Sequence, residues 1–451
     1  MEFVIDFSEI PSNNPIAFGW WFIKTIGWIY PVFLFVYGLI LVWQNYIRNR
    51  YRKTRHYILL AIDIPKNNEQ TPRAVENIFS HLAGAHQPLN FYNRWWDGEI
   101  PDSFSFEIIS IGGYIQFLIH FPDKYRDLIE AIIYAQYPDA EITEVDDYTK
   151  HWSIKFPNTE HDLWGTEVKL AKKYVYPVVT YEEFEDSISQ ELKDPMASLL
   201  EPLTRIGPGE EIWVQFVTTP ADNNWGEKAQ PVINKIIGAK EGGGKKNIFD
   251  WLFVIPNMIL EGINPAPAGT TTKKDEPPNR MLYLTQGEKD EVAAIEHKIC
   301  KIGFHVRIRW VYVAEKPKFV KMRGAQGVYG GFKQFNDLGL NSFKPDSKFM
   351  TGGIVWFKKK RLIWRKNRIM YRYKDRCHSL APGEYGFILN TEELASLWHF
   401  PIMTVKAPMV QKTESKKAEP PTALPTAISR SFGLPKSANI KAGPPTNLPT
   451  S

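Results

Sequence analysis

The first strong pattern along the chain is a run of nineteen uncharged residues, Thr25–Trp43. At 1.5 Å of rise per residue, a helix of this length matches the hydrocarbon core of a bilayer, which is about 30 Å thick. Aromatic rings favour the two membrane interfaces, and they gather towards both ends of the run, as Trp20, Trp21, Trp28 and Tyr30 and as Trp43 and Tyr46. The pattern predicts a transmembrane helix with its interface over residues 16–47.

Two other interpretations of this run are less well supported. A secretory signal peptide needs a basic leader, a shorter apolar region and a small-residue cleavage site, whereas the leader MEFVIDFSEI is acidic and the run ends in bulky residues. A buried core helix is disfavoured because this segment is apolar on all sides and ends in a cluster of charges. We therefore expect a membrane anchor.

A cluster of cations follows the apolar run directly, whereas only Lys24 precedes it. Cytoplasmic flanks carry the excess of Lys and Arg, so the body is predicted to be cytoplasmic and a short leader, 1–15, to lie outside. Each cation near anionic headgroups contributes about 1 kcal/mol. The predicted membrane-surface residues are Arg48, Arg50, Arg52, Lys53 and Arg55.

The next hundred residues alternate strand and helix patterns. A β-branched apolar run at 56–64 precedes a helical pattern at 71–84, and two alternating runs then flank Gly112-Gly113, which favour a two-residue hairpin turn. A second helical pattern at 123–137 and a final alternating strand complete the order β-α-β-β-α-β. This order predicts a ferredoxin-like lobe over residues 48–150 and an α+β fold class.

The patterns after residue 150 are less regular. Apolar strands at 207–220 and 305–314 and helices at 225–237 and 287–304 predict a second, irregular α+β lobe. The remaining predicted segments are a linker with a helix (151–206), the second lobe (207–346) with a mobile Gly-, Lys- and Pro-rich insertion (239–279), a basic helix and a capped terminal helix (347–401), and a disordered Pro-rich tail (402–451).

Composition and motif spacing exclude several kinds of site and identify no catalytic one. Cys300 and Cys377 are far apart and lack CxxC spacing, which excludes a cysteine-based metal site and a disulfide framework and favours a reducing compartment. The stretch GAKEGGGKK does not fit the phosphate-loop spacing. The ten histidines lack ligand spacing, and GxSxG and Cys-His patterns are missing. We therefore predict no catalytic residues, cofactor or metal, and a protein that is not an enzyme.

The formal charge of +5 matters less than its placement, because ten Lys or Arg and one acid fall within residues 356–376. On a helix, Leu362, Ile363, Ile369, Met370 and Tyr373 would gather on one side, with cations over the rest. Three interpretations of such a helix are open. It presents a solvated face, it contacts anionic lipid, or it contacts nucleic acid with Trp364 and Tyr371 stacking on bases. An anionic partner is favoured, with lipid and nucleic acid both open, through Lys358, Lys359, Lys360, Arg361, Arg365, Lys366, Arg368 and Arg372.

Four segments resemble one known family: LTRIGPGEEIWVQFVTTPA (203–221), GFKQFNDLGLNSFKPD (331–346), FILNTEELASLWHFP (387–401), and IYAQYPDAEITEVDDY (133–148). This is an uncharacterised bacterial membrane-anchored domain that often precedes a conjugation-type coupling or type IV secretion ATPase. The resemblance covers most of residues 50–425 and carries over no catalytic residues. It implies a stand-alone copy of the domain in the inner membrane. It also implies a terminal helix with Thr391 as its N-cap, and Glu392 and Glu393 suit the positive N-terminal end of that helix.

These observations combine into one hypothesis: a single-pass inner-membrane scaffold of a type IV secretion or conjugation-like apparatus, working with membrane lipid and with an ATPase supplied in trans. The alternative is a membrane-bound module for nucleic acid or anionic lipid with no secretion role. A third candidate is an unrecognised hydrolase, which would need a concave site with convergent carboxylates or histidines.

Overall fold

The computed structural model describes most of the body and the apolar helix. The predicted leader 1–15, the insertion 239–279 and nearly all of the tail 402–451 lie outside the described residues, which are 27, 29–65, 68–184, 193–238, 284–352, 356–376, 378 and 386–402.

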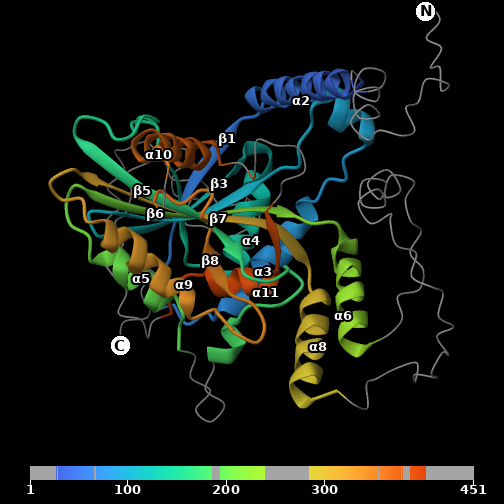
Figure 1. The fold of residues 1–451 in the computed structure, drawn as a ribbon. Helices are drawn as coiled ribbons and strands as arrows, with labels where there is room; N and C mark the ends of the chain where they lie inside the picture. The colour runs from blue at the N-terminus through green and yellow to red at the C-terminus, as the bar shows by residue number, and fades with distance from the viewer. Residues whose placement is uncertain are drawn as a thin grey trace, which may run out of the picture.

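The body is built on one sheet in which every pair of neighbouring strands is antiparallel (Figure 1). The strand order is β4-β1-β3-β2-β6-β7-β5-β8, and β9 pairs with β7. The strands are β1 (Tyr57–Asp63), β2 (Phe104–Ile111), β3 (Tyr114–Pro122), β4 (Glu141–Glu144), β5 (His161–Leu170), β6 (Glu210–Pro220), β7 (Gly303–Glu315), β8 (Phe343–Pro345) and β9 (Phe387–Asn390).

The first four strands confirm the predicted ferredoxin-like lobe. Their order, β4-β1-β3-β2, is that of a split βαβ unit, with α3 (Pro72–Leu82) after β1 and α4 (Arg126–Gln136) after β3. The predicted hairpin turn is also confirmed, because Gly112 and Gly113 have φ of +59° and +96°. Both values lie in the region that glycine enters without steric cost.

The second half of the sheet repeats this topology, which corrects the expectation of an irregular lobe. If β5, β6, β7 and β8 are counted as first to fourth, their order is again 4-1-3-2, with α5 (Met196–Thr204) after the first and α9 (Val328–Lys333) after the third. The pattern was obscured because α6 (Gln230–Ile237) and α8 (Gln286–Ile299) separate β6 from β7 where the first unit has a hairpin. The unit also begins earlier than expected, since β5 lies within the predicted linker.

The two units join edge to edge through their second strands. β2 and β6 pair along eight residues, with Glu107 opposite Gln215 near the middle. Because this pair is antiparallel and the strand order reverses across it, the two units are related by an approximate two-fold axis through the joint. The body is therefore one continuous sheet.

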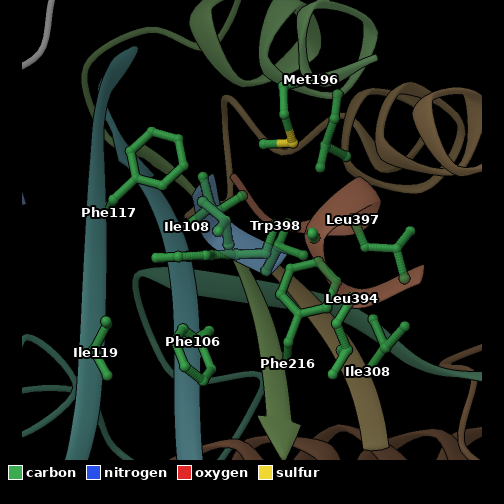
Figure 2. Close-up of a cluster of buried hydrophobic side chains, with 14 of the residues drawn as sticks. Phe106, Ile108, Phe117, Ile119, Met196, Phe216, Ile308, Leu394, Leu397 and Trp398 are labelled. Atoms are coloured by element: carbon green, nitrogen blue, oxygen red, sulfur yellow. The ribbon is translucent and has the colours of Figure 1, made fainter. Parts of the chain in front are cut away.

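Alternation along the strands gives the sheet two buried faces. One face packs against α3, α4, α5, α9 and α11 (Thr391–Leu397) in the main core, with Trp398 at its centre (Figures 1 and 2). The opposite face is covered by α10 (Lys358–Asp375), which buries Ile369, Met370 and Tyr373 against side chains such as Trp213. Leu362 and Ile363 were predicted for the same apolar stripe. Leu362 is half-buried and Ile363 is 44% exposed, because the first half of α10 extends past this core.

The apolar N-terminal segment forms a single long helix, α2 (Ile29–Lys53). It is long and apolar enough to cross a membrane, and most of its large apolar side chains, from Tyr30 to Tyr46, are exposed. The helix runs beyond the predicted end of the span and carries four of the five predicted membrane-surface cations on its last turns, whereas Arg55 follows the helix. The apolar segment and most of the basic segment are thus one rigid element.

The last helix is capped one residue earlier than expected. Asn390, not Thr391, is the N-cap: its side chain accepts from the backbone N–H of Glu393 at 2.8 Å, and the Glu393 carboxylate accepts from the N–H of Asn390 at 3.0 Å. Asn390 ends β9 with extended backbone, the conformation an N-cap needs. The Thr391 hydroxyl instead lies 3.2 Å from the Glu76 carboxylate.

Candidate functional site

The basic helix α10 is the element on which the sequence placed most of its candidate contacts. Lys and Arg are good helix formers, and both ends of the helix are marked by left-handed residues, Phe357 with φ of +50° and Arg376 with φ of +47°. Cations suit the last turn of a helix and disfavour the first. The helix dipole therefore stabilises the cations in the last turn of α10 and destabilises those in its first turn.

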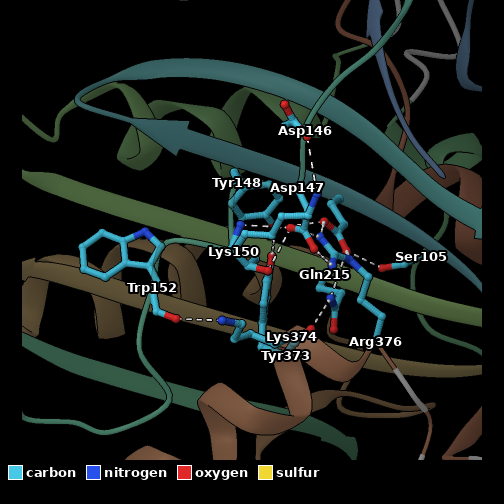
Figure 3. Close-up of polar contacts among 12 residues, drawn as sticks. Ser105, Asp146, Asp147, Tyr148, Lys150, Trp152, Gln215, Tyr373, Lys374 and Arg376 are labelled. Atoms are coloured by element: carbon cyan, nitrogen blue, oxygen red, sulfur yellow. Dashed lines mark hydrogen bonds and ion pairs between the residues drawn. The ribbon is translucent and has the colours of Figure 1, made fainter. Parts of the chain in front are cut away.

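The C-terminal end of α10 is fixed to the sheet by a buried polar network around Glu107, which is 0% exposed. Figure 3 shows Arg376, Asp147 and Tyr148 of this network. Arg376 donates to Glu107 at 2.7 and 3.2 Å and to Asp147 at 2.8 and 3.1 Å. Glu107 also accepts from Ser105 at 2.6 Å, Tyr148 at 2.8 Å and Gln215 at 2.9 Å. The network lies at the joint between the two units.

The protonation states of the groups in this network are set by their burial and by the positive charge of Arg376. Burial alone would raise the pKa of Glu107, but the charge and hydrogen bonds of Arg376 hold that pKa below its ordinary value. Burial would lower the pKa of Arg376, and Glu107 raises it well above the usual range. Burial, then the positive charge of Arg376, lowers the pKa of His120 to about 3. At neutral pH the network holds an ionised pair beside a neutral histidine.

A second buried cluster surrounds Glu167 on β5. The carboxylate accepts from Arg307 at 2.8 Å, from Arg309 at 2.9 Å and from Arg372 of α10 at 3.0 Å. Burial would raise the pKa of Glu167, but Arg309, followed by the other two guanidinium groups, lowers it to about 2. Arg309 also donates to Gln215 at 3.1 Å, which links the two clusters.

These contacts divide the eight predicted partner residues of α10 into two groups. Lys366 and Arg372 are buried and bind Asp162 and Glu167. Arg365 donates to the backbone oxygens of Met350 and Gly352, both at 2.9 Å, and Arg368 lies 4.7 Å from the centre of the Phe349 ring. Internal partners thus occupy these four, and we do not assign them to a ligand.

The other four cations occupy the first turn of α10 and point to solvent. Among the described residues, no carboxylate lies within ion-pair distance of Lys358, Lys359, Lys360 or Arg361, and all four are exposed. Large exposed rings accompany them: Trp356 is 73%, Phe357 79% and Trp364 56% exposed. We call these seven residues the α10 basic end.

The predicted membrane-surface cluster on α2 also divides. Arg52 forms an ion pair with Asp375 of α10 at 2.8 Å, and Arg55 lies 3.9 Å from Asp102. Arg50 and Lys53 are exposed, and Arg48 is half-buried. Arg52 therefore ties the end of the apolar helix to the end of the basic helix.

The hydrolase alternative requires a concave site with convergent carboxylates or histidines. Two hollows of about 300 and 320 Å³ are lined without histidine or cysteine. The first contains Glu167, which its arginines keep ionised. Burial raises the pKa of Glu211 to about 7, a shift also found in catalytic acids. Its carboxylate accepts from the Trp213 indole at 2.9 Å, and the shift in its pKa involves no titratable group among the residues that the structure describes.

Within the part of the chain that the structure describes, one group of donors has the spacing of a metal site. Oxygen and nitrogen atoms of Glu182, His297 and Glu392 lie within 4.8 Å of one another. The Lys301 ammonium lies 2.6 Å from Glu392 and 3.0 Å from Glu76. A cation of the chain itself thus neutralises the buried carboxylate, and we assign no metal here.

Sequence reasoning missed the residues that hold α10 in place. Glu107 is the one acid in the apolar strand FSFEIISI, and Arg307 and Arg309 alternate with apolar residues in HVRIRWVYVA. A charged residue inside a strand that is buried on both faces needs a partner. That signal identifies the groups but not their pairing, which depends on how the two units join.

A comparison with protein families finds one match. The model described as a domain of unknown function, DUF8128, matches residues 60–413. The matched range begins within β1, after α2, and covers the rest of both ferredoxin-like units together with α10 and α11. No curated protein matches the chain. Neither comparison tests the resemblance to the ATPase-associated domain, which stays a prediction.

Proposed function

Since the chain belongs to the DUF8128 family, whose function is unknown, we propose a role from its geometry: a membrane-anchored, non-enzymatic platform that holds a basic helix end against anionic lipid headgroups. In this proposal α2 crosses the cytoplasmic membrane of a bacterium once, with the N-terminus outside and the body in the cytoplasm.

The observation that carries this proposal is the uncompensated first turn of α10. Lys358, Lys359, Lys360 and Arg361 repel one another and also face the positive end of the helix dipole, which favours anions. The buried networks around Glu107 and Glu167 hold the other half of the helix rigid. Phosphate groups at the basic end would relieve both repulsions.

Two features favour lipid over nucleic acid as the source of those phosphates. Arg52 and Asp375 join the end of α2 to the end of α10 at 2.8 Å, and eighteen helical residues at 1.5 Å each span about 27 Å. The basic end therefore lies within about 27 Å of the point where α10 meets the end of α2. Its exposed Trp356, Phe357 and Trp364 beside cations match the composition of interfacial helices.

Lysine acylation of the full-length protein in nanodiscs tests the lipid contact. We expect Lys358, Lys359 and Lys360 to react several-fold more slowly in nanodiscs containing phosphatidylserine than in phosphatidylcholine alone, because headgroups would cover them. High salt should restore the rate, since exposed charges are screened. Mass spectrometry reports each lysine, and exposed Lys289 on α8 is the internal control.

Equal rates in both lipids would contradict the lipid contact. Binding of single-stranded DNA by the detergent-solubilised chain, with a steep salt dependence that a variant with glutamine at positions 358–361 flattens, would instead support the nucleic-acid alternative.

A wider role as scaffold for a secretion or conjugation-type ATPase in trans rests on the family resemblance alone. If it is right, the full-length protein purified from its native membrane in mild detergent should carry such an ATPase or another secretion component, detectable by mass spectrometry. Repeated purification without one would count against the scaffold and leave the lipid contact untouched.

A further inference from the structure

The geometry points to a second membrane contact: a turn of exposed aromatic residues, seated on the end of α2, that lies in the lipid interface and fixes the body against the bilayer. This inference rests on α2 being the membrane anchor, as proposed above. It does not depend on the α10 basic end. We call residues 91–98 the aromatic turn.

The aromatic turn exposes an unusual amount of ring surface. Its side chains are exposed by 76% at Phe91, 62% at Tyr92, 40% at Trp95 and 64% at Trp96. Aromatic side chains bury about 150–250 Å² each when covered, so the open patch amounts to several hundred Å². Monomeric soluble proteins rarely leave patches larger than this uncovered, which indicates a binding surface.

The rings are ordered among themselves and continuous with α2. Phe91 stacks on Trp95 with ring centres 5.6 Å apart, and Tyr92 stacks on Trp96 at 6.3 Å. Trp96 lies 6.3 Å from Trp43 of α2, which is itself 47% exposed. One belt of aromatic rings therefore runs from the membrane helix onto the body.

The turn is seated on α2 by a backbone contact that only glycine permits. Gly98 has φ of +70°, and a Cβ there would lie 2.6 Å from the carbonyl carbon of Ile47 and 2.9 Å from the backbone nitrogen of Arg48. Gln44 donates to the backbone oxygen of Trp95 at 3.4 Å. In the described part of α2, Gln44 and Ile47 are the buried residues, so this seat is where the helix meets the body.

The position of the seat selects lipid as the occupant. It lies at residues 43–48, where the uncharged run of α2 gives way to its cations and where a spanning helix leaves the hydrocarbon core. Tyr and Trp favour this level of a bilayer, because their rings are apolar and their O–H and N–H groups reach the headgroups. A protein partner or a second copy would have to share this level with lipid.

A site-specific fluorophore tests this contact in the full-length chain. In a Cys300→Ser/Cys377→Ser background, an environment-sensitive label is placed on Trp96→Cys, with Ile40→Cys in α2 as the membrane reference. Tyr114→Cys is the matched control: Tyr114 is aromatic and 43% exposed, and it begins β3, whose other end, Pro122, pairs with Tyr57 next to α2. Each protein is reconstituted as a single copy in neutral nanodiscs, so that lipid charge and a second copy play no part.

We expect nitroxide-bearing lipids to quench the label at 96 several-fold more strongly than the label at 114, and aqueous iodide to show the reverse order. If 40 is quenched by lipid but 96 behaves like 114, the anchor stands and the aromatic contact is wrong. If 40 is also open to iodide, the membrane anchor itself is wrong.

Gly98→Ala provides a second test. The added methyl group would collide with the backbone of α2 at a positive φ, so the label at 96 should lose its lipid quenching and approach the value at 114. Gly84→Ala is the control, because nothing lies within 4 Å of its Cβ position and its φ is ordinary. Unchanged quenching in Gly98→Ala would overturn the role of the seat on α2.

Discussion

Replacing Arg376 with alanine should lower the free energy of unfolding by about 3–5 kcal/mol, the usual effect of removing one partner of a buried ion pair. Arg376 is 4% exposed and makes four hydrogen bonds to Glu107 and Asp147. Without it, Glu107 keeps only neutral donors in a site with no access to water. Urea denaturation of the detergent-solubilised chain, followed by circular dichroism, measures the change.

The pH dependence of this loss separates a charge effect from a packing effect. In the variant the pKa of Glu107 should rise above its unfolded value, because burial is no longer opposed by a guanidinium. A carboxyl group whose folded-state pKa is raised costs its full amount of stability above that pKa, and the cost falls to zero as the pH drops to the unfolded-state pKa. The deficit should therefore be largest near about pH 8 and shrink towards about pH 5, whereas a simple packing defect would not change.

Two further variants sharpen the comparison. Arg361→Ala removes an exposed cation from the same helix and should change stability by about 0.5 kcal/mol or less. Arg376→Gly should be less harmful than Arg376→Ala by about 1 kcal/mol, because position 376 has φ of +47°, which glycine adopts without strain. Similar stability for Arg376→Ala and Arg361→Ala would contradict the role given to the network.

Local patterns predicted the first half of the body well because each signal there is short-range. Gly112-Gly113 specifies its own turn, and the helices on either side of the hairpin have clear apolar spacing, so the ferredoxin-like order could be read directly. The second unit has the same order, but about eighty residues separate β6 from β7, and no hairpin turn links them. The repeat is visible only once the strands are paired.

The basic helix shows a different limit of sequence reasoning. Its charge and its helical spacing were plain, yet Lys366 and Arg372 look no different in the sequence from Lys359 and Arg361. Their roles differ because Asp162 and Glu167 lie beneath the second half of the helix, a contact set by the sheet. The aromatic turn was missed for a similar reason: exposure of Trp95 and Trp96 is a tertiary property.

The terminal segment is a last case in which tertiary structure changes the interpretation. The sequence suggested that α11 closes the body as a capped helix at its end. In the structure β9 adds to the sheet beside β7, and α11 packs against α3 within the main core. Lys298 and Glu393, 1% and 0% exposed, form an ion pair at 2.9 Å that ties α8 to α11. The segment is thus an internal part of the fold.

Trp398→Ala should consequently destabilise the whole body, by about 3–5 kcal/mol. The indole is 0% exposed and lies beside the rings of Phe106 on β2 at 4.9 Å and Phe117 on β3 at 5.9 Å (Figure 2). The ring of Phe400 lies 5.1 Å away. Truncation leaves a cavity at the centre of the first unit that the rigid sheet cannot close, so the transfer and cavity costs add. Denaturation followed by circular dichroism measures the loss without relying on tryptophan fluorescence.

Trp356→Ala is the matched control, because it removes the same side chain from a position that is 73% exposed. It should leave stability within about 0.5 kcal/mol of the parent protein while weakening the lipid contact of the α10 basic end. A Trp398→Ala protein as stable as Trp356→Ala would mean that the terminal segment docks loosely on a body that folds without it. The expected large difference would instead show that residues 386–402 complete the core shared by the sheet and α3, so that the body depends on this segment for its stability.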